Sequence, residues 1–174
     1  MIRPSDTEFA PFYARYVALV PESGILEALE GQTGVLRATV NAVLPDKELF
    51  RYAPDKWSVR QVFGHLIDGE RVFAYRALCF SRGESAPLPS FDEKVYIAKS
   101  HYDERPLLAL LAELTDLRKA NLHFFRSLTD GQWAQVGIAS GNPITVRALA
   151  FIMVGHIRHH LGVLRDRYGI QPAL

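Results

Sequence analysis

The 174-residue chain has very little cysteine, no large excess of either charge and no long apolar run. Its single cysteine, Cys79, cannot form an internal disulfide, and it excludes a zinc site built from several cysteines. A formal net charge of +1 gives no strong attraction to nucleic acids or anionic membranes, so we expect neither as a partner. No run approaches the ~20 apolar residues of a membrane span, and the first residues lack the apolar core of a signal peptide. These absences predict a cytoplasmic protein of ordinary globular composition.

Four long segments of the chain have apolar residues at the spacing of a helix. The second has the clearest start, because Ser58 and Gln61 fit a capping box in which side chains bond the unpaired backbone N–H groups. The fourth is expected to begin near Thr145 and to end before Gly169, a residue type common just after a helix. No segment shows a convincing strand alternation. We expect helices over about residues 22–44, 58–83, 103–128 and 145–168.

This pattern predicts an all-α protein of one domain, built as a four-helix bundle. Residues 1–20 are rich in aromatic side chains, and we expect them to form an arm laid over a bundle domain of residues 21–174. The arm could cover the mouth of a pocket or contact a partner. Residues 84–102 form a long connection between the second and third helices, with room for a short helix. A connection of this length in a compact domain is more often functional than idle.

The most informative segment is the run from His156 to His160. Two histidines four residues apart lie one turn apart on the same helix face, so both imidazoles can reach one metal ion. His159 is also one turn from His156, and spacing alone leaves the partner open. The apolar stripe directs His156 and His160 toward the bundle and leaves His159 nearer the flank. His65, on the inward side of the second helix, would complete a site of three imidazoles, which suits Zn, Ni, Fe(II) or Co and leaves positions open for water or a thiolate.

Each histidine has a simpler explanation when it is taken alone. An inward histidine is more often a hydrogen-bonded core residue than a ligand, and the i, i+4 pair is a weak motif. The three together favour a metal site, because burying three imidazoles for packing alone is costly. Asp68, one turn beyond His65, could orient a ligand imidazole or make an unrelated contact. We expect surface or packing roles for His101 and His123 and a structural role for the thiol of Cys79.

These residues match the pattern of a known family. The chain resembles the DinB-like superfamily, and within it the small metal-dependent hydrolases related to bacillithiol S-transferases. The resemblance covers roughly residues 20–170. It rests on three motifs in the right order: Trp57-Ser58-Val59-Arg60-Gln61-Val62 followed by Gly64-His65-Leu66-Ile67-Asp68, then Phe91-Asp92-Glu93-Lys94, then Gly155-His156-Ile157-Arg158-His159-His160.

The resemblance implies an up-down-down-up four-helix bundle, often dimeric, with a divalent metal, frequently Ni or Zn, on three histidines. Carried over by position, these ligands are His65, His156 and His160. The resemblance also implies transfer or isomerisation reactions in which a low-molecular-weight thiol, activated at the metal, attacks a small electrophile.

Two departures from the family pattern concern the substrate. Many members carry an Arg and a Gln just after the final pair of histidines. Here the pair is followed by Leu161-Gly162-Val163, and of these residues only Gly162 is shared with the family pattern. Tyr96 stands where close relatives tend to have Trp. We expect both positions on the substrate side, so the departures leave the metal ligands in place and the identity of the thiol or substrate open.

Two functions therefore stay open from the sequence. The first is a metal-dependent enzyme, a thiol S-transferase or a hydrolase, that forms a homodimer and acts on a small molecule. The second is a non-catalytic, dimeric bundle that binds a metal or ligand and is linked to a stress response. In a third interpretation the histidines bind no metal and are held in the bundle only by hydrogen bonds. Metal uptake, and its dependence on the three histidines, separates these interpretations.

Overall fold

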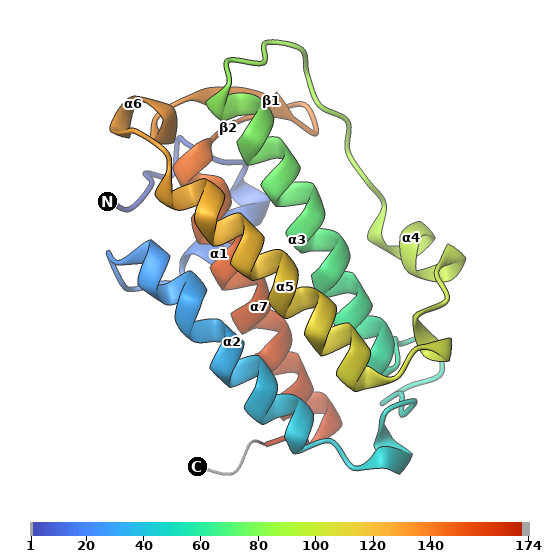
Figure 1. Ribbon diagram of the computed structural model, residues 1–174. Coiled ribbons are helices and arrows are strands. Elements are labelled where there is room, and N and C mark those ends of the chain that lie inside the picture. The colour runs from blue at the N-terminus through green and yellow to red at the C-terminus, as the bar shows by residue number, and fades with distance from the viewer. Residues whose placement is uncertain (1, 172–174) are drawn as a thin grey trace.

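Four long helices pack along one another (Figure 1). The buried apolar side chains form two clusters within this bundle. The computed structural model describes residues 2–171. The long helices are α2 (Ile25–Asn41), α3 (Val59–Ser81), α5 (Leu107–Arg126) and α7 (Val146–Tyr168). The shorter elements are η1 (Pro11–Tyr13), α1 (Ala14–Val17), η2 (Pro45–Lys47), α4 (Glu93–Lys99), η3 (Tyr102–Glu104), α6 (Asp130–Trp133), β1 (Val136–Ala139) and β2 (Asn142–Thr145).

The order of the helices around the bundle differs from their order along the chain. Helix α2 packs against α5 and α7, and α3 packs against the same two helices. Helices α3 and α5 run in the same direction, while α2 and α7 run in the opposite one (Figure 1). This is the predicted up-down-down-up arrangement. Because α3 and α5 are parallel, the connection between them must return along the whole bundle, which explains its length.

The capping signals in the sequence place the two helices that carry the histidines. At the start of α3, the Ser58 hydroxyl accepts a hydrogen bond from the Gln61 backbone N–H at 3.0 Å, and the Ser58 N–H donates to the Gln61 side chain at 3.2 Å. At the start of α7, the Thr145 hydroxyl accepts from the Ala148 N–H at 3.1 Å. Gly169 follows α7 with a left-handed φ of 69°. The predicted boundaries of both helices are thus confirmed.

The third helix begins later than the sequence indicates. The sequence predicts a start at Asp103, but residues 102–104 form the separate turn η3, and α5 begins at Leu107 after Pro106. The carboxylate of Asp103 accepts hydrogen bonds from Ser58 Oγ at 2.5 Å and Arg51 Nη2 at 2.7 Å. Asp103 therefore ties the connection to the start of α3 instead of capping α5. The first helix is also shorter than expected, Ile25–Asn41 in place of 22–44.

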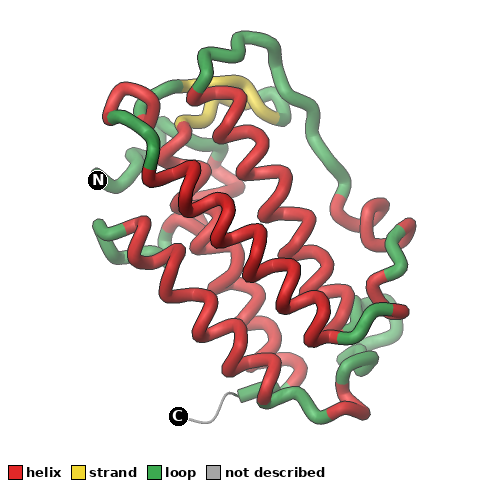
Figure 2. The backbone as a smooth tube through the Cα atoms, viewed as in Figure 1, coloured by secondary structure: helices red, strands yellow, loops and turns green. Residues whose placement is uncertain are grey.

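A small hairpin corrects the prediction that the chain has no strands. Strands β1 and β2 lie side by side (Figure 2). They pair antiparallel, and Ala139 lies opposite Asn142. Ser140 and Gly141 form the two-residue turn between them, with φ values of 53° and 77°. Positive φ at both positions is the geometry of a type I′ turn, which matches the twist of paired strands. The strands have only four residues each, too few for their alternation to be evident in the sequence.

The N-terminal residues form part of the core at one end of the bundle. Phe9, Tyr16, Val17 and Val20 are buried among side chains of α2, α3 and α7. The division into an arm of residues 1–20 and a domain of residues 21–174 stays a prediction. Within residues 2–171, no helix is both long enough and apolar enough to span a bilayer.

Glu8 anchors this N-terminal segment to the start of α7. Its carboxylate accepts hydrogen bonds from Arg147 Nε at 2.5 Å and Nη2 at 2.7 Å, and from the Thr145 hydroxyl at 2.9 Å. Burial raises the pKa of Glu8, but the bonds from Arg147, Ser5 and Thr145 outweigh burial and lower it from 4.5 to about 2. The charged form is therefore the one that the folded state stabilises.

We expect Glu8→Gln to destabilise the protein at neutral pH by about 1–2 kcal/mol, since water screens part of the interaction. Because the folded-state pKa is the lower one, the contribution is present above pH 4.5 and is lost as the pH falls toward about 2. Urea unfolding of both proteins at about pH 7 and about pH 2.5 measures the effect. A difference that does not shrink at the lower pH would contradict this role for the carboxylate.

A buried polar network crosses the middle of the bundle. Arg118 of α5 donates from Nε and Nη2 to the carboxylate of Glu70 on α3, both at 2.8 Å. Its Nη1 donates to the Gln32 side chain of α2 at 2.9 Å, and Gln32 donates to the Val154 carbonyl of α7 at 2.8 Å. Arg118 is 1% exposed and Glu70 is 3% exposed. All four long helices are therefore joined by one set of hydrogen bonds.

Candidate metal centre

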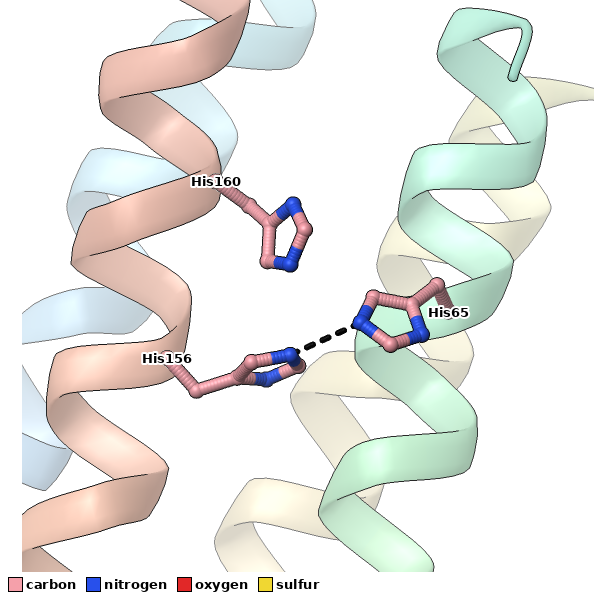
Figure 3. A group of neighbouring side chains, drawn as sticks. All are labelled: His65, His156 and His160. Carbon is pink, nitrogen blue, oxygen red and sulfur yellow. Dashed lines mark hydrogen bonds between the residues drawn. The ribbon is translucent and has the colours of Figure 1, made fainter. Parts of the chain in front are cut away.

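Three imidazoles converge between α3 and α7. His65 projects from α3 toward His156 and His160, which extend from successive turns of α7 (Figure 3). The centroids of the three rings are 4.7 Å apart in every pair. His65 and His156 are buried, and His160 is half-buried. The three residues that the sequence singled out are thus brought together.

The ring nitrogens lie close enough together to hold one metal ion after small movements of the rings. The Nε2 atoms of His65 and His156 lie 2.8 Å apart and share a hydrogen bond (Figure 3). Two nitrogens that bind one ion at ~2.0–2.1 Å are about 2.9–3.4 Å apart, so this pair would separate slightly around an ion. One ligand nitrogen from each of the three histidines lies within 4.8 Å of the others. Imidazole nitrogen is a good ligand for Zn, Ni, Co and Fe(II), so the three histidines suit a divalent transition metal.

Burial keeps these imidazoles neutral. It lowers the pKa of His65 to about 4, with a further contribution from His159. Burial also holds the pKa of His156 and His160 well below 6.5, and the neighbouring imidazoles add to the effect. The neutral ring, with a free lone pair, is the form that binds a metal.

Aromatic rings surround the cluster and fix its orientation. The Trp57 ring lies 4.8 Å from that of His65, and the Tyr16 and Phe73 rings lie 5.4 Å and 5.8 Å from that of His156. Trp57 immediately precedes the cap of α3, and Tyr16 belongs to the N-terminal segment. The sequence suggests that this segment could cover the mouth of a pocket, but nothing in it predicts the contact between the rings of Tyr16 and His156.

A pocket of about 410 Å³ gives access to the three histidines. Its lining comes from the N-terminal segment, the long connection and the hairpin as well as from α3 and α7. Arg15 and Glu93, both exposed, place opposite charges in this lining. The sequence singles out Glu93 only as part of the motif from Phe91 to Lys94, and sequence reasoning missed Arg15 together with Ser140 and Asn142 of the hairpin. None of the four has a spacing that would reveal its position, because each reaches the pocket through tertiary packing.

The remaining candidates lie outside the three-histidine cluster. His159 lines the pocket and packs against Tyr16, with ring centroids 5.4 Å apart, but it is not a member of the cluster. Asp68 accepts a hydrogen bond from the Tyr102 hydroxyl at 2.7 Å, and no hydrogen bond joins it to an imidazole among the described residues. Asp68 therefore does not orient a ligand ring in this arrangement. Burial raises the pKa of the Asp68 carboxyl group.

His101 and His123 are exposed, as expected, and Cys79 is a free, half-buried thiol packed against the core. The two positions that depart from the family pattern do not line the main pocket. Tyr96 lines a smaller pocket beside α3, and residues 161–163 line grooves elsewhere on α7. Val163 also lines a neighbouring pocket together with His160, and Tyr96 shares its pocket with Phe91. That these positions lie on the substrate side stays a prediction.

Gly155, next to His156, allows the N-terminal segment to pack directly on α7. A Cβ atom at this position would lie 2.0 Å from the Tyr16 carbonyl oxygen, which is backbone and cannot rotate away. We expect Gly155→Ala to displace Tyr16 from the histidines and to destabilise the protein by about 1–3 kcal/mol. Urea unfolding measures this loss.

Gly162 provides the matched control in the same helix. It has no heavy atom within 4 Å of the corresponding Cβ position. Gly162→Ala should stabilise the protein by roughly 0.5–1 kcal/mol, because alanine loses less backbone entropy in a helix. Equal effects of the two substitutions would contradict the packing argument at Gly155.

Comparison with known proteins supports the fold and establishes the family. The solved structure of YfiT from Bacillus subtilis, described as a probable metal-dependent hydrolase with an unusual four-helix bundle topology, superposes with a TM-score of 0.76. Its sequence is 21% identical, and the match covers 98% of this chain and 95% of that one. No curated protein sequence matches the chain. The family model described as the DinB superfamily matches residues 28–164, and the chain therefore belongs to the DinB superfamily.

Proposed function

We propose that this protein is a metal-dependent enzyme that acts on a small electrophilic substrate, either as a hydrolase or as a thiol S-transferase. The observation that carries the proposal is the convergence of three buried or half-buried imidazoles from two facing helices in the lining of one pocket. The description of YfiT as a probable metal-dependent hydrolase supports the same reaction class.

In this proposal His65, His156 and His160 hold one divalent transition metal, with Ni and Zn as the first candidates. When bound, the ion supplies Lewis acidity that polarises a carbonyl or lowers the pKa of a coordinated water or thiol. Trp57 and Tyr16 pack against the rings of His65 and His156 and restrict these two ligands.

The residues of the pocket are proposed to select and orient the substrate. The aromatic rings of Tyr16, Trp57 and Phe73 exclude water from one side of the imidazoles and favour an apolar substrate body. Arg15 and Glu93 offer one positive and one negative group to a polar substituent. A low-molecular-weight thiol is the proposed co-substrate if the reaction is a transfer.

The proposal is tested with protein loaded with Zn or Ni. One assay follows hydrolysis of 4-nitrophenyl acetate, and a second follows the reaction of 1-chloro-2,4-dinitrobenzene with cysteine or glutathione. We expect the metal-loaded wild type to accelerate one of these reactions. The rate with His160→Ala should be at least about 100-fold lower, because the substitution removes a metal ligand. Acceleration that is identical in wild type, His160→Ala and metal-free protein would contradict the proposed function.

Homodimerisation and a cytoplasmic location belong to the same proposal. Leu19, Val35 and Leu161 line a groove along α7, and the first two are exposed apolar side chains, which supports an interface. The single free cysteine supports a reducing compartment. Light scattering after size exclusion tests the dimer, and a molar mass near 19.6 kDa would contradict it.

A further inference from the structure

Among residues 2–171, two arginines are almost fully buried in the bundle, and a carboxylate of the same residues pairs with one of them. Arg118, 1% exposed, is paired with Glu70. Arg76, 2% exposed, has no carboxylate within ion-pair distance among residues 2–171. Arginine is rarely buried without a partner, because an uncompensated buried charge is strongly destabilising. The position of Arg76 therefore needs a further explanation.

The hydrogen bonds of Arg76 leave most of its guanidinium available. Its Nη2 donates to the Pro89 carbonyl at 2.8 Å and to the Ser140 hydroxyl at 3.0 Å. Three N–H groups, on Nε and Nη1, have no acceptor within the described part of the chain. No buried side-chain nitrogen or oxygen there lacks a hydrogen-bond partner, so Nε and Nη1 must keep access to solvent.

A second pocket, of about 290 Å³, supplies this access. It lies between α3 and the long connection, and Arg76 is one of its lining residues. The exposed Arg71 and Ser90 also line it, and the remaining walls are apolar or aromatic: Val72, Tyr75, Leu88, Pro89, Phe91 and Tyr96. The volume is at the small end of ligand pockets, which run from ~300 to ~1,000 Å³.

The chemistry of this pocket specifies the class of ligand. A shielded guanidinium recognises a carboxylate or phosphate through charge-assisted hydrogen bonds. The Phe91 ring, whose centroid lies 5.9 Å from the Arg76 guanidinium carbon, and the two tyrosines favour an apolar or aromatic body. A bare inorganic anion would leave these walls unused.

We propose that Arg76 and the surrounding pocket form a second ligand site, which binds a small organic carboxylate with an aromatic or branched aliphatic body. The carboxylate provides the counter-charge that no side chain of residues 2–171 places beside Arg76. The site is distinct from the pocket of the three histidines, although Phe91 lines both.

Calorimetric titration of the full chain with benzoate tests the proposal. Benzamide, which has the ring but no negative charge, and inorganic phosphate, which has the charge but no apolar body, are the comparison probes. We expect benzoate to bind with a Kd of about 1 mM or lower, and both other probes to bind at least about tenfold more weakly. Absence of benzoate binding up to about 10 mM, or binding of benzamide or phosphate that is as tight as that of benzoate, would overturn the proposal.

Variants locate the binding to this pocket. Arg76→Gln should weaken benzoate binding at least about tenfold, whereas Arg165→Gln, which removes an exposed positive charge, should not change it. Val72→Phe fills the pocket without removing the hydrogen bonds of Arg76, and it should also prevent binding. His156→Ala should retain wild-type affinity. Binding that survives Val72→Phe, or that is lost in His156→Ala, would place benzoate elsewhere and overturn the proposal.

Discussion

Zinc or nickel should raise the melting temperature of the metal-free protein by roughly 8–16 °C when the free metal is about 1,000 times its Kd. A ligand that binds only the folded state stabilises it by about 4 kcal/mol at that ratio. The folded chain already gathers three neutral imidazoles around one point, and the unfolded chain does not. Differential scanning fluorimetry with and without each ion measures the shift.

The histidine variants decide whether this shift belongs to the proposed site. His156→Ala removes one of the three proposed ligands and should abolish the shift, whereas His101→Ala, at an exposed histidine outside the cluster, should retain it. Magnesium, which prefers oxygen ligands, should give no shift. An equal shift in wild type and His156→Ala would mean that the metal binds elsewhere on the chain.

Arg118→Met should destabilise the protein by about 3–5 kcal/mol. The substitution removes the guanidinium that pairs with the buried carboxylate of Glu70, and it leaves that charge uncompensated among the four helices. Chemical unfolding monitored by circular dichroism measures the loss. Arg126→Met, on the same helix but at an exposed pair with Glu30, should cost less than about 1 kcal/mol.

A double variant separates the loss of the pair from the loss of packing. In Glu70→Leu with Arg118→Met, neither charge remains buried, so the double variant should recover at least about half of the stability lost in Arg118→Met. Additive losses would contradict the conclusion that the uncompensated charge is the cause. In that case the hydrogen bonds to Gln32 and to the Leu29 carbonyl would carry the stability of the network.

Local signals explain why most of the bundle could be predicted from the sequence. The capping box at Ser58 and the glycine at position 169 act through hydrogen bonds and backbone angles of neighbouring residues, which the sequence displays directly. The inward direction of His65, His156 and His160 follows from helical periodicity, which needs no knowledge of the neighbouring helices. The agreement between these signals and the structure is closest for α3 and α7, the helices that carry the candidate site.

Features that depend on contacts distant in the sequence could not be predicted in this way. Arg118 lies on the apolar stripe of α5, but its partner Glu70 is 48 residues away, and no local spacing joins them. Asp103 resembles a helix cap, but its carboxylate bonds Ser58 and Arg51 instead. The pocket lining also combines the N-terminal segment, the connection and the hairpin, which meet only after the bundle has formed.

The most direct test of the account is the metal content of untagged protein, measured by elemental analysis for wild type and His160→Ala. The account predicts about one transition-metal ion per chain in the wild type and little in His160→Ala, because the variant removes one of the three ligands. A wild-type protein that is purified without metal and takes up neither Zn nor Ni would contradict the central claim. The three imidazoles would then be a hydrogen-bonded part of the core.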